Sequence, residues 1–579
     1  MAESAGYTAP TTAPTAAPRG YSGRQRAELI ERLERRVFDL VIIGGGINGA
    51  AIARDAALRG YSVALIEMQD FAEGTSSRSS RLIHGGLRYL EHAEFALVFE
   101  SLSERTLLAR IARHLVRPLH FVFPVYSGAR RGLFTASVGM WLYDVLAMFR
   151  NHRRHSRMSP DDLARHVPKL RQHGLKGAVA YYDYQTDDAR LVLENVISAV
   201  EAGAVCCPRL RAEAYEGEWK GQKRLLVRDL LTDRTFTVHA RAGICAAGPW
   251  TDDLVSRTKS GGRHWLRPTK GVHMVVPGDR VSVPSAIVMQ HPNDSRVLFA
   301  LPYHERTVIG TTDTFFEGSP SDVHATSEDI DYLLAAAGHY FPDAKLTRDD
   351  VISTWAGIRP LVAEDKSNPG AVSREHRILA RNDGMVVIAG GKLTTYRRMA
   401  AECVDTAIEI IADADGPRRV TDTPTGKLPL PGAEGLDSDA DLEALTERVS
   451  AQIGDHEVGE HLVLTYGARA MRVARLAERD GSLRERIADD LPFVWAQIAY
   501  AARDEMALTL ADALVRRTHV FYRDRDQGLG VLARAADVMG RELGWDAAER
   551  ERQLTDYRAE VEANRGWRSA SERAARAAG

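Results

Sequence analysis

The pattern of hydrophobic positions predicts alternating strands and helices from residue 37 onward. Residues 37–44 (VFDLVIIG) form a nearly continuous apolar run, which suits a strand buried on both faces. Residues 47–60 have the spacing of a helix that ends at a glycine, and residues 61–67 form a second apolar run. Further strand-like runs lie at residues 241–248, 273–277, 306–312 and 385–391. The alternation predicts an α/β fold.

The two ends of the chain differ from this pattern. The first 22 residues are rich in Ala, Thr and Pro and lack the basic start and apolar stretch of a secretory signal, which predicts a disordered tail. Residues 23–36 place apolar side chains at helical spacing between arginines, and this predicts a leader helix that is either solvated or in contact with an anionic membrane. Residues 421–432, dense in Pro, Gly and Thr, predict a linker, and residues 433–579 are almost wholly helical in pattern.

The longest apolar stretch lies at residues 133–149. Asp144 interrupts it, and it is shorter than the ~20 apolar residues that a spanning helix needs. A transmembrane segment is therefore not expected. Two alternatives remain open, namely a helix of the core and an amphipathic patch that lies on a bilayer.

Length and composition narrow the class of protein. At roughly 100–200 residues per domain, 579 residues predict two or three domains. Lys+Arg 76 against Asp+Glu 78 argue against a chain that wraps nucleic acid. The four cysteines (Cys206, Cys207, Cys245 and Cys403) are too few for a disulfide scaffold and form no CxxC pair. We therefore expect a reduced, intracellular protein without a metal site.

A glycine turn separates the first predicted strand from the first predicted helix. Gly44, Gly46 and Gly49 form a G-x-G-x-x-G set, which permits a tight turn, the approach of a pyrophosphate and close packing of helix on strand. The second strand ends at Glu67, eighteen residues past Gly49, where a carboxylate can accept hydrogen bonds from ribose hydroxyls. The turn predicts a dinucleotide site, with NADP the least suited ligand because Glu67 would repel its 2′-phosphate.

The residues after Glu67 distinguish FAD from NAD. Residues 69–91 (QDFAEGTSSRSSRLIHGGLRYLE), at this distance from the glycine turn, resemble FAD-dependent glycerol-3-phosphate dehydrogenases. Further motifs of that family follow in order, namely YYDYQTDDARLVLEN, AAGPW, PTKGVH, IGTTD, WAGIRPL, AVSREH and AGGKLTTYRRMA. The resemblance covers residues 39–399. Arg81 is a departure from the family pattern, because relatives often carry Lys there, and Arg keeps the charge but not the hydrogen-bond geometry. The EF-hand pattern of mitochondrial members is missing, so the chain resembles the bacterial form of the quinone-linked enzymes.

The resemblance implies an architecture. It predicts an FAD-binding Rossmann-like domain of the glutathione-reductase/amino-acid-oxidase type over residues 37–420, with an inserted mixed α+β substrate-binding domain and a C-terminal all-helical domain. The substrate-binding segments are expected at roughly 115–185 and 265–355. A cytoplasmic protein held peripherally at the inner face of the membrane is implied, and the oligomeric state stays open, a homodimer included.

The resemblance also implies a reaction. The family oxidises sn-glycerol 3-phosphate to dihydroxyacetone phosphate in glycerol and phospholipid metabolism, with hydride passing to flavin N5 and electrons to a membrane quinone. Two alternatives remain, an oxidase that reduces oxygen and an FAD-binding interaction protein without turnover. An amine or amino-acid oxidase could share the fold, but its site would need fewer cations.

The chemistry assigns roles to residues within the matching motifs. The substrate phosphate needs cationic donors, for which the motifs offer Arg88, Tyr89, Arg359, Arg374 and Lys392. His84 is the predicted proton acceptor, because an imidazole titrates near neutral pH. Arg359 is expected to position the substrate, and Lys392 to stabilise negative charge on the flavin. With Arg88, these three are the predicted catalytic residues.

The cofactor is expected to be non-covalent FAD, because no His or Cys attachment pattern is evident. Asp187 and Asp188 are assigned to structure rather than to a metal, because neighbouring carboxylates on a strand point to opposite faces. The predicted FAD contacts are Gly44, Gly46, Ile47, Asn48, Gly49, Glu67, Thr75, Ser76, Ser77, Ser80, Leu82, His84, Gly85, Gly86, Ala247, Gly248, Trp250, Gly391, Lys392, Leu393 and Thr394.

Overall fold

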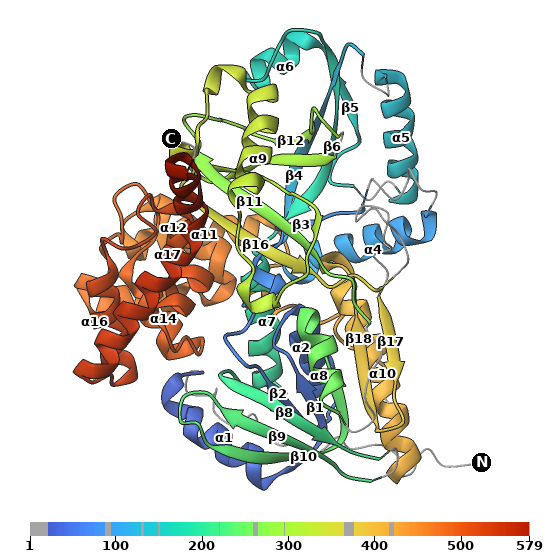
Figure 1. The fold of residues 1–579 in the computed structure, drawn as a ribbon, viewed down its shortest axis with the longest axis vertical. Coiled ribbons are helices and arrows are strands. Elements are labelled where there is room, and N and C mark those ends of the chain that lie inside the picture. The colour runs from blue at the N-terminus through green and yellow to red at the C-terminus, as the bar shows by residue number, and fades with distance from the viewer. Residues whose placement is uncertain are drawn as a thin grey trace.

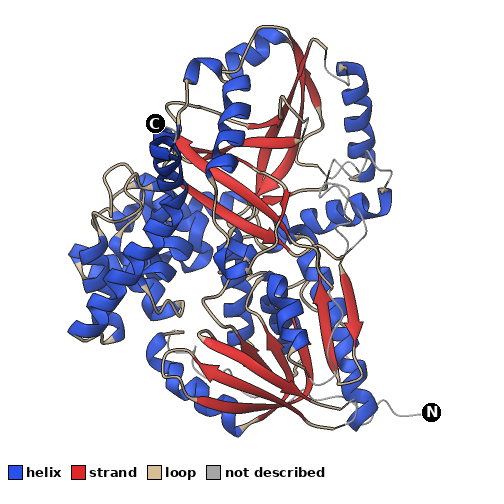
Figure 2. Ribbon diagram, viewed as in Figure 1, coloured by secondary structure: helices blue, strands red, loops and turns tan. Residues whose placement is uncertain are grey.

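The chain folds into two sheet-containing parts with a group of helices beside them (Figure 1). The computed structural model describes residues 21–86, 94–128, 132–148, 151–218, 221–258, 265–294, 296–363, 376–415 and 422–577. Figure 2 shows the two sheets stacked along the long axis of the molecule, with helices packed around each. The C-terminal helices lie along one side of both sheets.

The first sheet carries the predicted nucleotide-binding elements. Its strand order is β17-β18-β10-β1-β2-β7, with β9 pairing β10 and β8 pairing β9. The four pairings that join β18, β10, β1, β2 and β7 are parallel, and β1 is buried at every position except Val37. The strands are β1 Val37–Ile43, β2 Val63–Ile66, β7 Val205–Cys207, β8 Leu210–Glu216, β9 Lys223–Asp229, β10 Thr235–Cys245, β17 Arg377–Ala380 and β18 Met385–Ala389. The helices of this part are α1 Arg26–Arg35, α2 Ile47–Leu58, α7 Asp188–Glu201, α8 Thr251–Ser256 and α10 Tyr396–Asp415.

The second sheet is mixed and is inserted between segments of the first. Its order is β15-β11-β14-β13-β12-β4-β6-β3, and β16 pairs β11 while β5 pairs β6. The strands are β3 Leu82–Ile83, β4 Arg117–Tyr126, β5 Ser156–Met158, β6 Leu175–Gln185, β11 Thr269–Pro277, β12 Ala286–Gln290, β13 Val297–Tyr303, β14 Arg306–Gly310, β15 Thr314–Phe315 and β16 Ser353–Arg359. Its helices are α4 Phe95–Ile111, α5 Leu133–Leu146, α6 Pro160–His166 and α9 Ser327–Tyr340.

The C-terminal part is helical, and its core is continuous with that of the second sheet. One hydrophobic cluster joins Val275 and Trp355 of the sheet to Leu462, Leu514 and Phe521 of the helices. The helices are α11 Asp439–Ile453, α12 His456–Tyr466, α13 Ala470–Arg479, α14 Trp495–Asp504, the π-helix η12 Asp512–Arg517, α15 Val520–Arg523, α16 Leu532–Leu543 and α17 Ala547–Ala577. The 3₁₀ turns used below are η2 Thr75–Ser77, η3 Gly248–Trp250, η8 Leu393–Thr395 and η10 Gly467–Arg469. The predicted fold class is confirmed.

The predicted leader helix exists as α1, but the environment expected for it was wrong. Leu29, Ile30 and Leu33 are buried in the core of the first sheet rather than facing solvent or a membrane. Arg26 is buried as well, and its Nη2 lies 2.6 Å from Asp229 Oδ1. The sequence pattern indicated that one face of this helix is apolar, but it did not indicate which part of the molecule packs against that face. The structure shows that the face packs into the core.

The described part of the predicted linker, residues 422–432, is anchored along its length. The Arg54 guanidinium of α2 donates to the carbonyls of Leu428 and Pro429, at 2.9 and 3.2 Å. Leu430 is fully buried, and the Gly432 N–H donates to Glu194 Oε2 at 2.7 Å. Proline and glycine mark the absence of regular structure here, and the segment is nevertheless docked against the first sheet's helices.

Candidate functional site

The glycine turn between β1 and α2 has the geometry that a pyrophosphate requires. Gly44 has φ +109°, and a Cβ there would lie 2.5 Å from the carbonyl oxygen of Ala246 at the end of β10. A Cβ on Gly49 would collide with the Gly44 carbonyl, so helix and strand pack at the distance that only glycine allows. At Gly46 a Cβ would meet only Ser76 Oγ, at 3.1 Å. The turn is therefore closed on its protein side and open at Gly46, where the helix N-terminus begins.

Glu67 lies beside this turn at the end of β2. Its Oε2 accepts from the Gly45 N–H at 2.5 Å, and its Oε1 accepts from the Gln69 N–H at 2.7 Å. The pKa of the Glu67 carboxyl is raised to about 7, mainly by burial. The neighbouring carboxylates of Glu73 and Asp70 act in the same direction, and the two backbone donors act against it. An oriented carboxylate next to an open glycine turn fits the ribose and pyrophosphate of a dinucleotide.

The loop from Gly74 to Gly86 connects the two sheets. Thr75 Oγ1 donates to the carbonyl of Ile358 in β16 at 2.6 Å, and Trp355 Nε1 of the same strand donates to the Ser79 carbonyl at 3.1 Å. Ser76 Oγ accepts from the Ile47 N–H at the start of α2, at 3.0 Å. Leu82 pairs with Gln185 of β6 as part of β3. The predicted cofactor loop thus spans from the glycine turn to the second sheet.

His84 at the end of this loop is tied to the turn after β18. Its backbone N–H donates to Thr394 Oγ1 at 3.1 Å, and Thr394 Oγ1 donates back to the His84 carbonyl at 3.2 Å. The His84 side chain is exposed, and its Nδ1 accepts from the Gly86 N–H at 3.0 Å. Gly391 has φ +103° and directly precedes Lys392, the N-cap residue of η8. Lys392, Leu393 and Thr394 are therefore brought to the His84 end of the loop.

The AAGPW turn lies at the other end of the same loop. Gly248 has φ +52° and starts η3 directly after β10 and Ala247. A Cβ on Gly74 would lie 3.0 Å from Trp250 Cζ3, so the Trp250 ring covers the start of the loop. Three separate strand ends, those of β1, β10 and β18, thus converge on one loop, as expected at the carboxyl edge of a parallel sheet.

Arg359 stands at the end of β16, in the second sheet. Its Nη1 lies 3.0 Å from Asp313 Oδ1, and its Nη2 donates to Thr311 Oγ1 at 3.1 Å. A Cβ on Gly271 of β11 would collide with the guanidinium, so the glycine of the PTKGVH motif makes room for this cation. These contacts orient a planar donor group that suits an oxyanion.

The structure adds one residue that the sequence analysis did not single out. His273 of β11 is buried, its Nε2 lies 2.8 Å from Ser80 Oγ, and its ring stacks on Trp355 with centroids 5.0 Å apart. Burial, together with the charges of Arg359 and Arg81, lowers the pKa of His273 to about 3, so the imidazole is neutral. The signal was present in PTKGVH, a polar residue within an apolar strand.

Arg81 lies on the opposite side of the loop from the glycine turn. It is buried, with its guanidinium 4.9 Å from the ring centroids of both Tyr303 and Trp355, and its Nη1 donates to Tyr303 Oη at 2.6 Å. It borders a cavity of about 450 Å³ between the second sheet and the C-terminal helices, which residues 44–49 and 75–77 do not line. The Arg81 guanidinium thus packs against aromatic rings at the interface between the second sheet and the C-terminal helices.

Several predicted site residues have other outcomes. Arg88, Tyr89 and Arg374 lie outside the described residues, so their roles stay predictions. Asp187 and Asp188 were wrongly placed on a strand, since Asp187 caps α7 by accepting from the Arg190 N–H at 2.9 Å, and Asp188 begins that helix. Asp188 Oδ2 accepts from Ser79 Oγ at 2.7 Å, which is a structural role. Within the described residues no cluster of three or more His, Cys, Asp or Glu could hold a metal ion.

Comparisons with known proteins agree with this architecture. Residues 39–397 match the model of the FAD dependent oxidoreductase family, and residues 423–550 match the C-terminal domain of alpha-glycerophosphate oxidase. FAD is therefore the cofactor that the open glycine turn and Glu67 fit.

Relatives match over almost the full chain. A glycerol-3-phosphate dehydrogenase from Synechocystis sp. is 37% identical over 92% of this chain and 98% of its own length. An aerobic glycerol-3-phosphate dehydrogenase from Staphylococcus saprophyticus is 34% identical over 91% of this chain and 95% of its own. The solved structure of the glycerol-3-phosphate dehydrogenase from Bacillus halodurans, complexed with FAD, is 31% identical and superposes with a TM-score of 0.76, covering 94% of this chain and 98% of that one. The chain belongs to the family of FAD-dependent glycerol-3-phosphate dehydrogenases.

Proposed function

We propose that this protein oxidises sn-glycerol 3-phosphate to dihydroxyacetone phosphate and passes the electrons to a membrane quinone. The observation that carries the proposal is the similarity to proteins named glycerol-3-phosphate dehydrogenase over 98% of the length of one such relative. His84, Lys392 and Thr394 lie together at one end of the loop from Gly74 to Gly86. The same loop is hydrogen-bonded to β16, the strand that ends at Arg359. This arrangement supports a site for an anionic alcohol.

Arg359 binds and orients the substrate phosphate in this proposal. The guanidinium is already held by Thr311 and Asp313, so little side-chain freedom is lost when an oxyanion joins it. A dianionic phosphate competes with Asp313 for the same donors and gains from the fixed fork geometry. Arg88, Tyr89, Arg374 and Lys392 remain the proposed further donors.

Two imidazoles are candidates for the proton acceptor. FAD, when bound, takes the hydride from C2 of the substrate, and the C2 hydroxyl proton must then pass to the protein. His84 is exposed at the end of the loop, which favours access to substrate. His273 lies in the sheet, neutral and hydrogen-bonded to Ser80, and its pKa is lowered by Arg359. We propose His84 as the acceptor and His273 as a neutral group that orients the hydroxyl.

The pH dependence of flavin reduction separates these two roles. His84→Gln should remove the limb of the pH profile that reports the base and lower the rate of flavin reduction about 10²- to 10⁴-fold. His273→Gln keeps a hydrogen-bonding group and should lower the rate while leaving that limb in place. If the limb disappears in His273→Gln and persists in His84→Gln, the roles are reversed.

The central experiment is anaerobic. Glycerol 3-phosphate should bleach the absorbance of the bound flavin, whereas glycerol, which lacks the phosphate, should do so far more slowly at equal concentration. Denaturation of the holoenzyme should release FAD into the supernatant, as expected for non-covalent attachment. Absence of bleaching with glycerol 3-phosphate would contradict the proposed substrate.

The electron acceptor needs its own test, since one observation favours the oxidase. Residues 423–550 match a domain model named after alpha-glycerophosphate oxidase. Turnover should be fast with a soluble quinone analogue and should produce little hydrogen peroxide in air. Stoichiometric peroxide in air would assign the protein to the oxidases.

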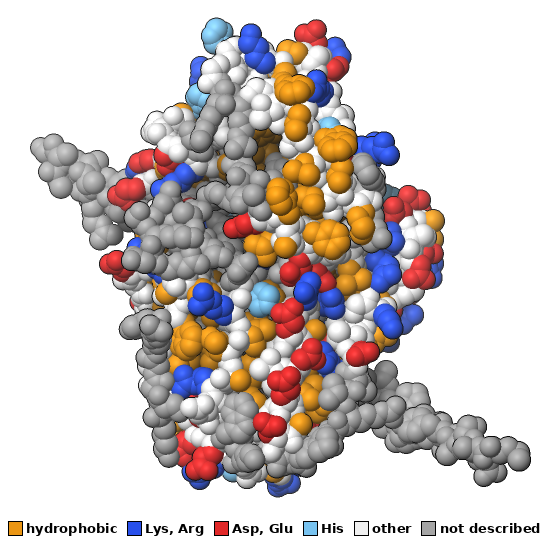
Figure 3. Space-filling view, turned by 90° about the vertical axis from the view of Figure 1, so that its right-hand side faces the viewer, with side chains coloured by type: hydrophobic (Ala, Val, Ile, Leu, Met, Phe, Trp, Pro, Cys, Tyr) orange, Lys and Arg blue, Asp and Glu red, His pale blue; other side chains and the backbone are white. Residues whose placement is uncertain are grey.

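An apolar face formed by α4 and α5 supports peripheral contact with a bilayer, where a quinone is dissolved. Phe134, Val138 and Trp141 lie on one side of α5 and are 74%, 52% and 58% exposed. Phe95 and Phe99 of the neighbouring α4 are each 45% exposed. Figure 3 shows hydrophobic side chains gathered over this face. In the described parts of the chain, no helix has both the length and the apolarity to cross a membrane.

Asp144, which interrupts this apolar stretch in the sequence, points into the protein. It is 3% exposed, and its Oδ2 lies 2.7 Å from His155 Nδ1. The side of α5 that carries Phe134, Val138 and Trp141 therefore has no charged residue of its own. An uncharged aromatic face of this kind suits the interfacial region of a bilayer.

Vesicle flotation tests this contact. Wild-type holoenzyme should float with vesicles of neutral and anionic phospholipid, and Phe134→Asp/Trp141→Asp should not, while its turnover with a soluble acceptor stays unchanged. Leu231→Asp is the matched control, because Leu231 is 47% exposed on the turn between β9 and β10, in the other sheet. Equal flotation of all three proteins would exclude this face as the membrane contact.

A further inference from the structure

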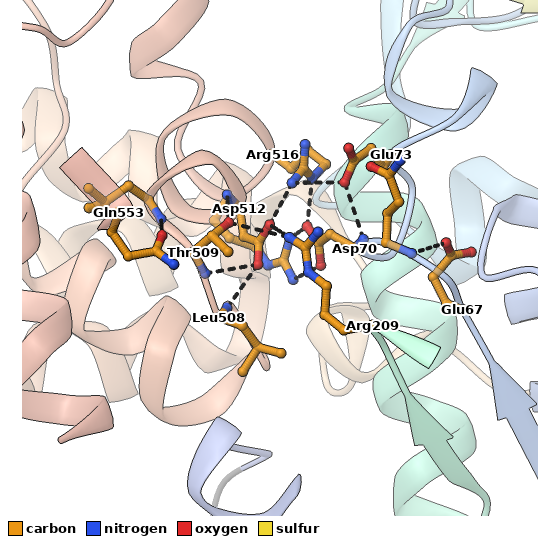
Figure 4. Close-up of polar contacts among 12 residues, drawn as sticks. Glu67, Asp70, Glu73, Arg209, Leu508, Thr509, Asp512, Arg516 and Gln553 are labelled. Atoms are coloured by element: carbon orange, nitrogen blue, oxygen red, sulfur yellow. Dashed lines mark hydrogen bonds and ion pairs between the residues drawn. The ribbon is translucent and has the colours of Figure 1, made fainter. Parts of the chain in front are cut away.

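A buried cluster of charged side chains joins the C-terminal helices to the turn that follows β2 (Figure 4). At its centre is Asp70, which is 1% exposed. Asp70 Oδ2 accepts from Arg516 Nε and from Arg517 Nη1, both at 2.6 Å, and Asp70 Oδ1 accepts from Arg517 Nη2 at 2.9 Å. Both arginines belong to η12, and we refer to the set Asp70, Glu73, Arg209, Asp512, Arg516 and Arg517 as the Asp70 cluster.

The cluster is extended on both sides of the domain boundary. Arg516 Nη2 lies 2.7 Å from Asp512 Oδ1 and 3.3 Å from Glu73 Oε2. Arg209 Nη2 lies 2.6 Å from the same Asp512 oxygen. Asp512 Oδ2 in turn accepts from the Leu508 and Thr509 N–H groups, at 2.9 and 3.0 Å. Each buried carboxylate in the cluster is therefore paired, as its burial requires.

The turn held by this cluster is the one that sets the Glu67 carboxylate. The Gln69 N–H donates to Glu67 Oε1 at 2.7 Å and stands next to Asp70 in the chain. Asp70 and Glu73 close the turn, since the Asp70 N–H donates to Glu73 Oε2 and the Glu73 N–H to the Asp70 carbonyl, each at 3.2 Å. The Ala72 N–H donates to the carbonyl of Gly45, inside the glycine turn, at 3.1 Å. Displacement of Asp70 would therefore displace both the Glu67 carboxylate and the glycine turn between β1 and α2.

We propose that Arg516 and Arg517 are positioning residues of the FAD site, through which the C-terminal helical domain holds the Asp70 turn and so keeps Glu67 in place for the cofactor. By linkage the effect is reciprocal, so bound FAD also strengthens the docking of that domain. The inference depends on the cofactor and not on the proposed substrate or electron acceptor.

Electrostatics act in the same direction as geometry. Burial alone would raise the pKa of Asp70, but Arg517 and Arg516 outweigh it and hold the pKa well below its usual range. Asp70 and Glu73 both disfavour the ionised form of Glu67, the form that accepts from ribose hydroxyls. The two arginines place positive charge beside Asp70 and so offset the negative charge that these carboxylates bring close to Glu67.

A second buried pair provides the control for simple domain adhesion. Arg469 of η10 pairs with Glu194 of α7, and the two are 5% and 0% exposed. This pair also joins the C-terminal helices to the first domain, but it does not contact the turn from Glu67 to Glu73. Arg469→Gln therefore weakens docking as Arg517→Gln does and leaves the Glu67 turn intact.

The test measures FAD release from purified holoenzyme, through the rise in flavin fluorescence after dilution, and flavin content after dialysis. For Arg517→Gln we expect FAD affinity to fall roughly tenfold or more, because a charge-assisted contact is lost. Arg517→Lys keeps the charge without the fork and should be intermediate. Arg469→Gln should lower the melting temperature while its FAD affinity stays within about twofold of wild type. Turnover per bound flavin should be unchanged in all three, because the proposed role of the cluster concerns the Glu67 turn and not Arg359 or His84.

Two results would overturn the inference. One is wild-type FAD affinity in Arg517→Gln, and the other is an equal loss in Arg517→Gln and Arg469→Gln, which would reduce the cluster to domain adhesion. Should Arg517→Gln fail to fold, Arg517→Lys decides alone, since unchanged FAD affinity there would also refute the role. If wild type and all variants bind FAD but none turns over glycerol 3-phosphate, the proposed substrate is contradicted, and the comparison of FAD affinities still decides the role of the cluster.

Discussion

FAD affinity should depend on pH through Glu67. Burial raises the pKa of this carboxyl to about 7, and its oxygens already accept from the Gly45 and Gln69 N–H groups. The ionised carboxylate is the stronger acceptor for ribose hydroxyls, because the protonated form carries an O–H donor and less acceptor capacity. The cofactor therefore binds the deprotonated form and displaces a proton when the pH is near or below 7. By linkage, affinity rises with pH up to about 7 and is level above it.

The magnitude follows from the same pKa. If FAD binds only the ionised form, the apparent Kd increases about tenfold for each pH unit below 7. At pH 6 the affinity should thus be roughly tenfold lower than its plateau. Glu67→Gln should remove this dependence, because an amide does not titrate. It should also weaken binding at pH 8, since its NH₂ group would face a backbone donor and leave it unpaired, at a cost of about 1–3 kcal/mol.

The assay is a fluorescence titration of apoprotein with FAD between pH 6 and pH 8. Wild type should show the slope, and Glu67→Gln should show a flat line at lower affinity, about 5- to 150-fold below wild type at pH 8. A pH-independent Kd in wild type would refute the assignment of the raised pKa to the cofactor site. An unchanged slope in Glu67→Gln would show that another group titrates.

Three further predictions rest on single contacts. Gly46→Asp should abolish flavin content, because Gly46 is the open position of the turn and a carboxylate there would meet the pyrophosphate. Arg359→Ala should lower kcat/KM for glycerol 3-phosphate roughly ten- to a hundred-fold, for the loss of about 1.5–3 kcal/mol, with a much smaller effect on glycerol. Leu33→Ala should lower the free energy of unfolding by about 2–5 kcal/mol, measured by denaturant titration, because α1 is part of the core. A surface helix would give a value near zero for Leu33→Ala.

The parts of the fold that the sequence predicted correctly are those determined by local pattern. The run of residues 37–43, the glycine turn and the strand that ends at Glu67 lie within about thirty residues, and their burial and turn chemistry can be read without knowing what else is nearby. The apolar runs at residues 241–248 and 385–391 likewise predicted the ends of β10 and β18, and the AAGPW and AGGKLTTYRRMA motifs lie at the turns that follow these strands.

The parts that it could not predict depend on contacts between distant segments. Arg26 pairs with Asp229, 203 positions away, and this converts an apparent surface helix into core. Asp70 and Arg517 are 447 positions apart, and neither stands out within its own motif as a cofactor residue. His273 is one polar residue in an apolar strand of the sequence, and only the fold shows that it contacts Ser80 and Trp355.

The polar loop after Glu67 illustrates why the family motif is longer than the cofactor contact alone would require. Four of its hydroxyl groups hydrogen-bond to four different elements of the fold. The pairs are Thr75 with Ile358 of β16, Ser76 with Ile47 of α2, Ser79 with Asp188 of α7 and Ser80 with His273 of β11.

Because these four bonds reach elements of both sheet-containing parts, the position of the loop depends on both parts. A single hydrogen bond of this kind contributes about 0.5–1.5 kcal/mol, so no one of them fixes the loop. Together they do so only when the two sheets and α7 are already assembled around it. The loop carries His84 at one end and borders the glycine turn at the other, so the same contacts set the spacing between the two. Short polar side chains make these four bonds at 2.6–3.0 Å, so a larger side chain at any of the four positions would have to displace its partner.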